Sequence, residues 1–405
     1  MSSKSSINFL DKLLDGVEVE WMHLGGLGEL LRGNGLQKKD FTEAGVPAIH
    51  YGQIYTHYGL ATTVTKSFVS PDLATQLRKV DKGDVVITNT SENLEDVGKA
   101  LVYLGECQAV TGGHATVFKP NKWVLGKYFA YFTQTDVFAN EKRKYAKGTK
   151  VIDVSATDMA KISIPIPCPS NPKKSLEIQS EIVRILDTFT ELTAELTAEL
   201  TARKKQYNYY RDKLLSFEEG EVEWKTLGAL VDINTGSKPP EILENATIFD
   251  YINAGTSRSG YSAASNCAGD TVTTPSRGQG GIGYVGYQRD PFWLGPLCYK
   301  LQSTNKAVLI NKYLFYFLQS RSELLLGLKK EGGVPAVNKS DLIQLEVPVP
   351  LPEEQKRIVA ILDKFDALTH SITEGLPREI ALRQKQYEYY RDLLFSFPRP
   401  EEMVS

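Results

Sequence analysis

The most regular pattern in the chain is a stripe of apolar residues between about Leu176 and Phe217. Successive members lie mostly four or three positions apart, a heptad-like spacing that is typical of a coiled-coil helix. The stripe consists of Ile178, Ile182, Ile185, Phe189, Leu192, Leu196, Leu200, Tyr207, Tyr210 and Leu214. We predict one long amphipathic helix here, roughly 60 Å in length.

A second stripe with the same spacing lies near the end of the chain. Its members are Ile358, Ile361, Phe365, Leu368, Ile372, Ile380, Tyr387, Tyr390 and Leu394. Gly375-Leu376-Pro377 interrupts it, and because proline lacks a backbone donor, we expect the helix to kink or restart there. Each stripe needs a covering surface, and the simplest arrangement pairs the two helices as an antiparallel coiled coil. The alternative is that each helix packs only on its own domain.

The two stripes belong to a long internal repeat. Arg203–Phe217 reads RKKQYNYYRDKLLSF and Arg383–Phe397 reads RQKQYEYYRDLLFSF, identical at 11 of 15 positions. Further matches are Ile178–Phe189 with Glu354–Phe365, Ile164–Pro167 with Val347–Pro350, Lys127–Thr135 with Lys312–Ser320, and Glu18–Gly25 with Glu221–Gly228. The chain is therefore two copies of one domain-and-helix unit.

The middles of the two copies, roughly residues 29–120 and 232–305, match poorly. This contrast indicates a shared scaffold that carries two different working surfaces, although plain duplication and drift is the alternative. The predicted domains are residues 1–170, a central helix over 171–217, a second domain over 218–350 and a C-terminal helix over 351–405. Within the central helix, TAEL occurs twice, at Thr193–Leu196 and Thr197–Leu200, and each copy adds about 6 Å of helix.

Composition and motifs argue against several classes of protein. The chain has 405 residues and a formal net charge of −2. Its hydrophobic fraction of 41% is close to that of ordinary globular proteins. Its four cysteines form no C-x-x-C pair, and the sequence contains no run of roughly 20 apolar residues that could span a bilayer. We therefore expect a cytoplasmic protein. A P-loop, H-E-x-x-H and G-x-S-x-G are absent, and the glycine-rich run from Gly278 lacks the following helix of a dinucleotide site. No catalytic residues and no metal site are predicted.

Both middles are rich in side chains that suit base edges and phosphates. Residues 1–170 carry a net charge of +1 and residues 218–350 of −2, so a DNA ligand would need a partner to enclose it. The candidate DNA-binding residues of the first domain are Gln53, Tyr55, His57, Asn89, Thr90, Asn93, His114, Lys142, Arg143 and Lys144. Those of the second domain are Asn253, Arg258, Ser276, Arg277, Gln279, Lys329 and Lys330. Arg258 and Arg277 could each bind guanine in a bidentate manner.

Taken together, these segments resemble the DNA specificity (S) subunits of type I restriction–modification systems. The resemblance rests on the two Tyr-rich repeats, SEIVRILD and KRIVAILD, EGLPREI at 374–380, EVEW in each half, and the TAEL repeats, which are typical of the type IC group. It implies an α+β fold with two target recognition domains separated by two antiparallel coiled-coil helices. Each domain would read one half of a bipartite double-stranded DNA site, and the TAEL number would set the spacer.

The resemblance also implies the partners. Two modification (methyltransferase) subunits would bind S-adenosylmethionine and methylate adenine N6, and restriction subunits would cleave unmethylated DNA, so this chain would be non-catalytic and would itself hold no cofactor. The expected docking and coiled-coil residues are Ile182, Phe189, Leu196, Tyr207, Tyr210, Ile358, Phe365, Tyr387 and Tyr390. The alternative function is a coiled-coil scaffold with two divergent protein-binding domains and no role on DNA.

Overall fold

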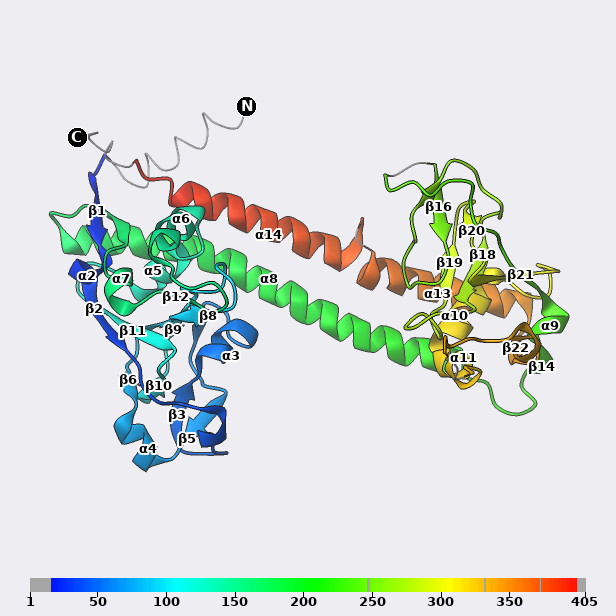
Figure 1. Ribbon diagram of the computed structural model, residues 1–405, viewed down its shortest axis with the longest axis horizontal. Helices are drawn as coiled ribbons and strands as arrows, with labels where there is room; N and C mark the ends of the chain where they lie inside the picture. Colours follow the sequence, from blue (N-terminus) through cyan, green and yellow to red (C-terminus); the bar gives the residue numbers. More distant parts are fainter. Residues whose placement is uncertain (1–15, 246–247, 331–332, 372, 399–405) are drawn as a thin grey trace. The chain divides into compact units, whose positions relative to one another are not determined.

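The computed structural model describes residues 16–245, 248–330, 333–371 and 373–398. The chain forms two compact units, and one of them is assembled from two distant parts of the sequence. Unit 1 comprises residues 1–195 and 381–405, whereas unit 2 comprises residues 196–380. Both units mix strands with helices (Figure 1), which confirms the predicted α+β class.

Unit 1 is built on a five-stranded sheet in the order β2-β11-β7-β9-β4 and a four-stranded sheet in the order β5-β3-β10-β6. Two short antiparallel pairs, β1·β13 and β12·β8, complete it. The strands are β1 (Val19–His23), β2 (Gly28–Arg32), β3 (Val46–Ile49), β4 (Ala61–Thr62), β5 (Ser67–Val69), β6 (Arg78–Val80), β7 (Val85–Thr88), β8 (Thr90–Ser91), β9 (Ala100–Tyr103), β10 (Ala109–Thr111), β11 (Ala115–Pro120), β12 (Ile152–Asp153) and β13 (Ser163–Pro167). The helices are α2 (Leu24–Leu27), α3 (Tyr51–Thr56), α4 (Pro71–Gln76), α5 (Gly126–Phe132), α6 (Asp136–Tyr145) and α7 (Ala156–Met159), with a 3-10 turn at Lys38–Asp40.

Unit 2 has a smaller version of the same plan. Its sheets are ordered β15-β21-β18-β19 and β17-β16-β20, with β14 paired to β22. The strands are β14 (Glu223–Thr226), β15 (Val231–Thr235), β16 (Phe249–Ile252), β17 (Tyr261–Ser262), β18 (Thr271–Pro275), β19 (Gly286–Gln288), β20 (Trp293–Leu294), β21 (Cys298–Ser303) and β22 (Glu346–Val349). The helices are α9 (Leu227–Leu230), α10 (Asn311–Ser320), α11 (Ser322–Gly327) and α12 (Lys339–Leu342). The order β2-β11-β7-β9 thus corresponds to β15-β21-β18-β19, which agrees with the sequence repeat.

The central helix α8 runs over Pro172–Leu214, close to the predicted Leu176–Phe217. It begins where the sequence provides both start signals. Asn171 accepts a hydrogen bond from the backbone N–H of Lys174 through its side chain, at 3.2 Å, and Pro172 occupies the first helical position. None of the described helices has the length and apolar character needed to cross a membrane.

The C-terminal helix is broken, as the Gly-Leu-Pro sequence predicts. Helix α13 covers Pro352–His370 and α14 covers Gly375–Leu394. Pro377 is the third residue of α14, in the first turn, where its missing N–H removes no intrahelical bond. Ile372, a member of the predicted stripe, lies outside the described residues.

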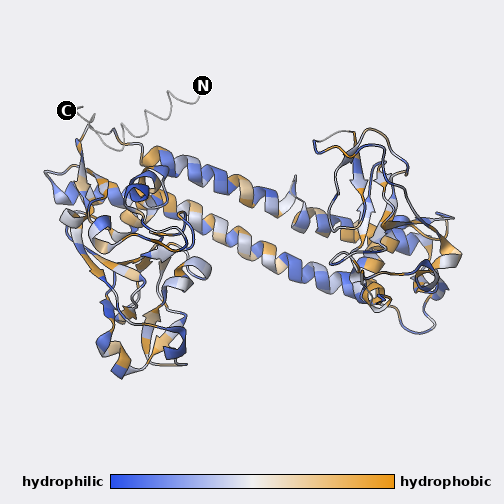
Figure 2. Cartoon of the chain, in the orientation of Figure 1, coloured by the Kyte–Doolittle hydropathy of each residue, from blue (hydrophilic) through white to orange (hydrophobic). Residues whose placement is uncertain are grey.

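The helices pair antiparallel within each unit. In unit 1 the ring of Phe189 on α8 stacks on Tyr390 of α14 at 5.2 Å, and in unit 2 Tyr210 of α8 stacks on Phe365 of α13 at 5.8 Å. Both helices alternate hydrophobic and hydrophilic positions along their length (Figure 2). The alternative in which each helix packs only on its own domain is therefore wrong.

Each unit is completed by the Tyr-rich segment of the other sequence copy. Tyr387, Leu394, Phe395 and Phe397 join the hydrophobic core of unit 1, whereas Tyr207 joins that of unit 2. Tyr207 contacts Phe365, and Tyr387 contacts Tyr131. The sequence repeat is thus not the structural repeat, because its last segment is exchanged.

A fully buried glutamine holds equivalent loops in the two units. In unit 1, Gln179 accepts a hydrogen bond from the backbone N–H of Leu125 at 2.9 Å and donates one to the carbonyl of Trp123 at 2.8 Å. In unit 2, Gln355 accepts from Ile310 and donates to Val308 at the same two distances. These bonds fix the starts of α5 and α10 against the long helices.

Candidate nucleic-acid interface

Backbone hydrogen bonds bring three loops of unit 1 together, and we call residues 89–91, 114 and 152–154 the unit 1 rim. The N–H of Asn89 donates to the carbonyl of His114 at 2.9 Å, and the carbonyl of Asn89 accepts from the N–H of Val154 at 2.9 Å. Thr90 pairs with Asp153 in the β8·β12 ladder. The predicted residues Thr90 and His114 therefore lie on one edge, although they are far apart in sequence.

A hollow of about 680 Å³ adjoins the unit 1 rim. Five of the predicted residues line it, namely Gln53, Tyr55, Thr90, Asn93 and His114. The Tyr55 hydroxyl donates to the carbonyl of Thr90 at 2.7 Å, and Oγ1 of Thr90 lies 3.0 Å from Nδ1 of His114. The predicted His57 is exposed outside this lining, and the Asn89 side chain is fully buried, with Oδ1 bonded to Thr116.

The hollow also contains groups that the sequence analysis did not select. His50 lines it, with its ring centroid 4.6 Å from that of Tyr51, and Lys38 and Lys66 add positive charge. Nδ1 of His50 accepts a hydrogen bond from the N–H of Gly52 at 3.1 Å, so in neutral His50 the proton lies on Nε2. Burial, and then the nearby Lys38, lower the pKa of His50, which favours this neutral donor form. His50 is the N-cap residue of α3, and its side chain accepts a hydrogen bond there. In the sequence it is the first residue of the aromatic-rich run His50–Tyr58.

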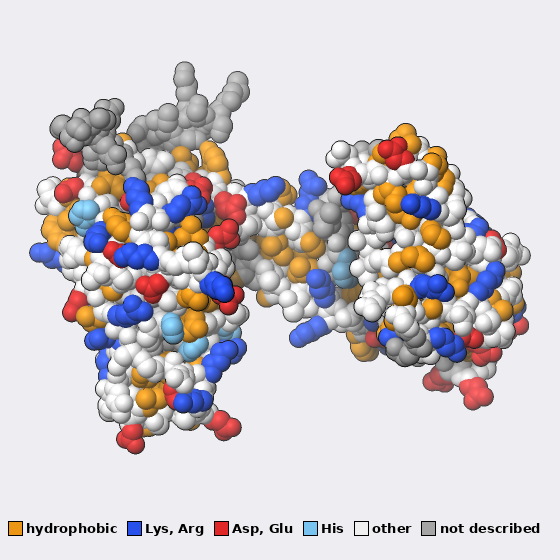
Figure 3. Space-filling view, in the orientation of Figure 1, with side chains coloured by type: hydrophobic (Ala, Val, Ile, Leu, Met, Phe, Trp, Pro, Cys, Tyr) orange, Lys and Arg blue, Asp and Glu red, His pale blue; other side chains and the backbone are white. Residues whose placement is uncertain are grey.

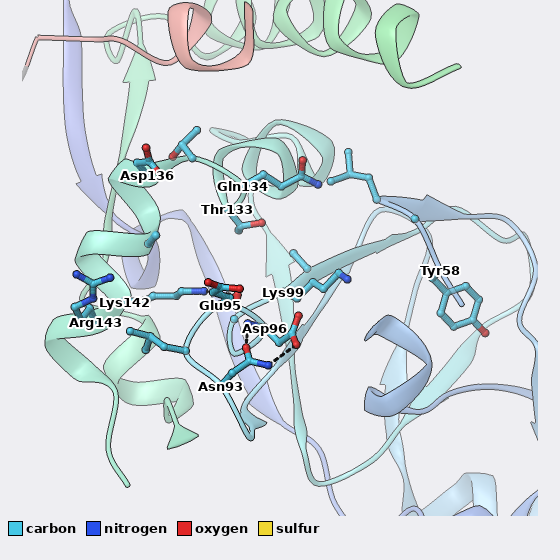
Figure 4. Close-up of a pocket in the computed structure, with 17 residues that line it drawn as sticks. Tyr58, Asn93, Glu95, Asp96, Lys99, Thr133, Gln134, Asp136, Lys142 and Arg143 are labelled. Carbon is cyan, nitrogen blue, oxygen red and sulfur yellow. Dashed lines mark hydrogen bonds between the residues drawn. The ribbon is translucent and has the colours of Figure 1, made fainter. Parts of the chain in front are cut away.

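The predicted basic run on α6 does not form a free cluster. Lys142 is buried, and its ammonium donates to the carbonyls of Glu95 at 2.8 Å and Val97 at 2.7 Å. Figure 4 shows Lys142 extending toward Glu95 in a second hollow of about 800 Å³ that Arg143 also lines. Burial lowers the pKa of Lys142 to about 8. Lys144 pairs with Glu141 at 3.0 Å.

Unit 2 has an equivalent edge, and we call residues 276–278, 297 and 335–337 the unit 2 rim. The N–H of Ser276 donates to the carbonyl of Leu297, and its carbonyl accepts from the N–H of Val337, each at 2.9 Å. Arg277 pairs with Ala336 through a backbone bridge. The same bonds therefore build both rims, and Arg277 occupies the position that Thr90 occupies in unit 1.

A lysine–aspartate pair anchors each rim to a short helix. In unit 1, Lys147 binds Asp158 of α7 at 2.8 Å, and in unit 2 Lys330 binds Asp341 of α12 at 3.2 Å. The backbones of these lysines form bridges to Asp153 and Ala336, members of the two rims. The predicted Lys330 thus corresponds to Lys147, and both take part in holding the scaffold.

The other predicted residues of unit 2 lie on adjoining loops. The side chain of Asn253 is hydrogen-bonded within the unit, since its Oδ1 accepts from the N–H of Leu297 at 3.0 Å. Gln279, by contrast, is exposed next to the rim. Arg258 pairs with Asp250 at 3.2 Å and lies 4.8 Å from the ring of Tyr261. Lys329 is half-buried beside Lys330. On the face of each unit that Figure 3 shows, basic side chains are interspersed with acidic ones.

The predicted docking residues divide into buried and accessible ones. Ile182, Ile358, Tyr207 and Tyr387 are buried in the unit cores. Phe189, Leu196, Phe365 and Tyr390 are half-buried, and Tyr210 is exposed. Within the described ranges, no group of three or more His, Cys, Asp or Glu side chains could hold a metal ion.

Comparison with known proteins agrees with this architecture. The chain is 40% identical to the Type I restriction enzyme EcoR124I/EcoR124II specificity subunit of Escherichia coli, over 98% of this chain and 99% of the relative. It is 33% identical to the EcoprrI specificity subunit of the same organism, over 91% and 93%. The S subunit from M. genitalium shares the fold with a TM-score of 0.62 at 18% identity, over 95% of this chain and 98% of that one.

A family model described as the type I restriction modification DNA specificity domain matches residues 16–203 and 219–382. The two matched ranges correspond to the two sequence copies and together span most of the chain. The chain therefore belongs to the family of type I restriction–modification DNA specificity proteins.

Proposed function

We propose that this protein is the specificity subunit of a type I restriction–modification complex and reads a bipartite double-stranded DNA target. Unit 1 reads one half-site and unit 2 the other, with rims of the same backbone construction and different side chains. The observation that carries the proposal is this duplication, in which Thr90 and Arg277 occupy equivalent positions. A scaffold that is repeated while its exposed residues differ suits two distinct half-sites.

The near-neutral charge of both units implies that partners supply much of the affinity for DNA. A DNA duplex attracts proteins largely through its phosphates, and here Lys147, Lys330 and Lys144 are already paired with carboxylates. We assign most contacts with the DNA phosphates to two modification subunits, which dock on the long helices near Tyr210 and Tyr390. S-adenosylmethionine binds to those subunits, and restriction subunits join the complex in the cytoplasm.

The TAEL repeats set the gap between the half-sites in this proposal, as in a type IC system. Thr193–Leu200 lies within α8, and its leucines are only half-buried. Insertion or deletion of four residues in this stretch alters the length of the helix without disturbing either unit core.

The test is to co-express the chain with its cognate modification subunit and to sequence the host DNA for N6-methyladenine. The expected result is methylation confined to one two-part motif with a fixed gap. A stable complex without any such motif would contradict DNA reading by this chain. Failure to form a complex would instead favour the scaffold with protein-binding domains, and a lysate pull-down that lacks a methyltransferase would agree with it.

A further inference from the structure

The equivalence of the two rims identifies one corresponding position in each unit, occupied by the half-buried Thr90 in unit 1 and by the exposed Arg277 in unit 2. Thr90 and Arg277 both follow a buried residue whose carbonyl is held by a valine N–H, and both pair with the opposite strand of the rim. The residues around them, Lys147 and Lys330 in particular, have the same contacts in both units. The scaffold is thus constant while the residue at this position changes from a hydroxyl to a guanidinium.

Arg277 has the properties expected of a side chain that reads a base. It is exposed, and no described carboxylate pairs with it. It begins a glycine-rich loop in which Gly278 and Gly280 have φ angles of 130° and 81°, and Gly281 lies against the backbone of Ala254, where a side chain would clash at 2.1 Å. The loop can therefore present Arg277 with little bulk around it. A guanidinium donates two parallel hydrogen bonds to O6 and N7 of guanine.

Arg258, the other arginine predicted to read guanine, is less suited. Its guanidinium is within 3.2 Å of Asp250 and lies over the ring of Tyr261. Binding a base edge would require both contacts to be given up, and nearby Asp250 would repel phosphates.

We infer that Arg277 is the residue of unit 2 that selects a guanine, and that Thr90 is its counterpart in the half-site read by unit 1. The inference rests on the proposed function and extends it, because it assigns a base to a residue. Arg277 forms a bidentate pair with guanine in the major groove, and Thr90, oriented by His114, makes a single hydrogen bond at the corresponding step. The half-site of unit 2 therefore contains an obligatory guanine.

The experiment measures methylation motifs and rates for the complex with wild-type chain, Arg277→Ala, Arg277→Gln and Arg277→Lys. Arg277→Ala should reduce discrimination at one guanine of one half-site by about 5- to 150-fold. Arg277→Gln should shift the preference at that position toward adenine, because an amide pairs with N6 and N7 of adenine. The other half-site and the spacer should not change in any variant.

Matched controls separate the possible failures. Arg258→Gln should leave the motif unchanged, and Thr90→Val should relax only the other half-site. An unchanged motif in Arg277→Ala, or an equal loss at all positions with a shallower salt dependence, would show a phosphate contact or no contact and would overturn the inference. A wild-type chain without a bipartite motif would overturn the proposed function itself. Thermal melting and co-purification of each variant verify that it folds and assembles.

Discussion

The hydroxyl of Tyr387 donates a hydrogen bond to the side chain of Gln134, which lies 253 positions earlier in the chain. The equivalent Tyr207 of unit 2 lies 3.4 Å from the side-chain oxygen of Gln319. Each tyrosine comes from the sequence copy whose domain it does not contact. These two bonds are therefore direct markers of the exchange of helical segments between the copies.

Removal of the Tyr387 hydroxyl should weaken unit 1 only. Tyr387→Phe is expected to lower the free energy of unfolding of unit 1 by about 0.5–1.5 kcal/mol, and Tyr387→Ala by about 3–5 kcal/mol, because the ring is buried. Hydrogen exchange of amides in α5 would report the change, with amides of α10 as the internal reference. Tyr389→Ala, at a ring 48% exposed, is the control, and a comparable loss there would contradict the assignment.

The buried glutamines Gln179 and Gln355 should each contribute to the stability of the unit in which they lie. Gln179→Leu leaves one backbone N–H and one carbonyl without their partner, whereas Gln355→Leu leaves one N–H and two carbonyls, those of Val308 and Pro350. We expect a loss of about 2–4 kcal/mol in the unit concerned. Urea unfolding followed by hydrogen exchange would assign the loss to a unit. Gln384→Leu, at an exposed position of α14, should change stability by less than about 0.5 kcal/mol.

Lys142 and Arg143, adjacent on α6, should differ in the property that they affect. Lys142→Met is expected to cost about 1–3 kcal/mol of stability, because two carbonyls lose their donor. Arg143→Ala should leave stability unchanged and, if Arg143 contacts phosphate, should reduce the slope of log affinity against log salt by about 1. The reverse result would mean that Lys142 leaves its buried position to reach DNA.

The pKa of Lys142 also predicts a pH dependence with a definite sign. Its pKa is about 8 in the folded chain and 10.5 in the reference state, so the unfolded chain binds more protons between these values. Stability contributed by Lys142 therefore rises with pH across this window, by at most about 1.4 kcal/mol per pH unit. The difference in unfolding free energy between wild type and Lys142→Met should accordingly be greater at pH 9.5 than at pH 7.5. A difference that shrinks with pH would indicate an ammonium that is stabilised in the fold.

Deletion of Thr197–Leu200 should change the spacer while both half-sites stay the same. The deletion shortens α8 by about 6 Å and changes its rotation by about 40°. Sequencing of N6-methyladenine in cells that express the variant with the modification subunit measures the spacer directly. The length-preserving Glu199→Gln is the control, and an unchanged spacer in the deletion would refute the role of the repeat.

Much of the scaffold could be predicted from the sequence because its signals are local. The stripe from Ile178 to Leu214 predicted α8 within a few residues, and Pro377 predicted the break before α14. The exchange of Tyr207 and Tyr387 could not be predicted, since periodicity identifies the apolar face and not the surface that covers it. The burial of Lys142 was missed for a similar reason. A run of lysine and arginine letters does not reveal that two backbone carbonyls, those of Glu95 and Val97, lie where they can accept hydrogen bonds from one of these lysines.

The exchanged segment has a consequence for synthesis of the chain on the ribosome. Residues 383–397, which supply Tyr387, Leu394, Phe395 and Phe397 to the core of unit 1, are made long after the rest of that unit. At about 5–20 residues per second, the gap between residues 195 and 397 lasts on the order of 10–40 s. During that time the apolar side chains of unit 1 that these residues cover in the finished fold remain uncovered. A stop codon after residue 380 would therefore damage the part of the protein that was translated first.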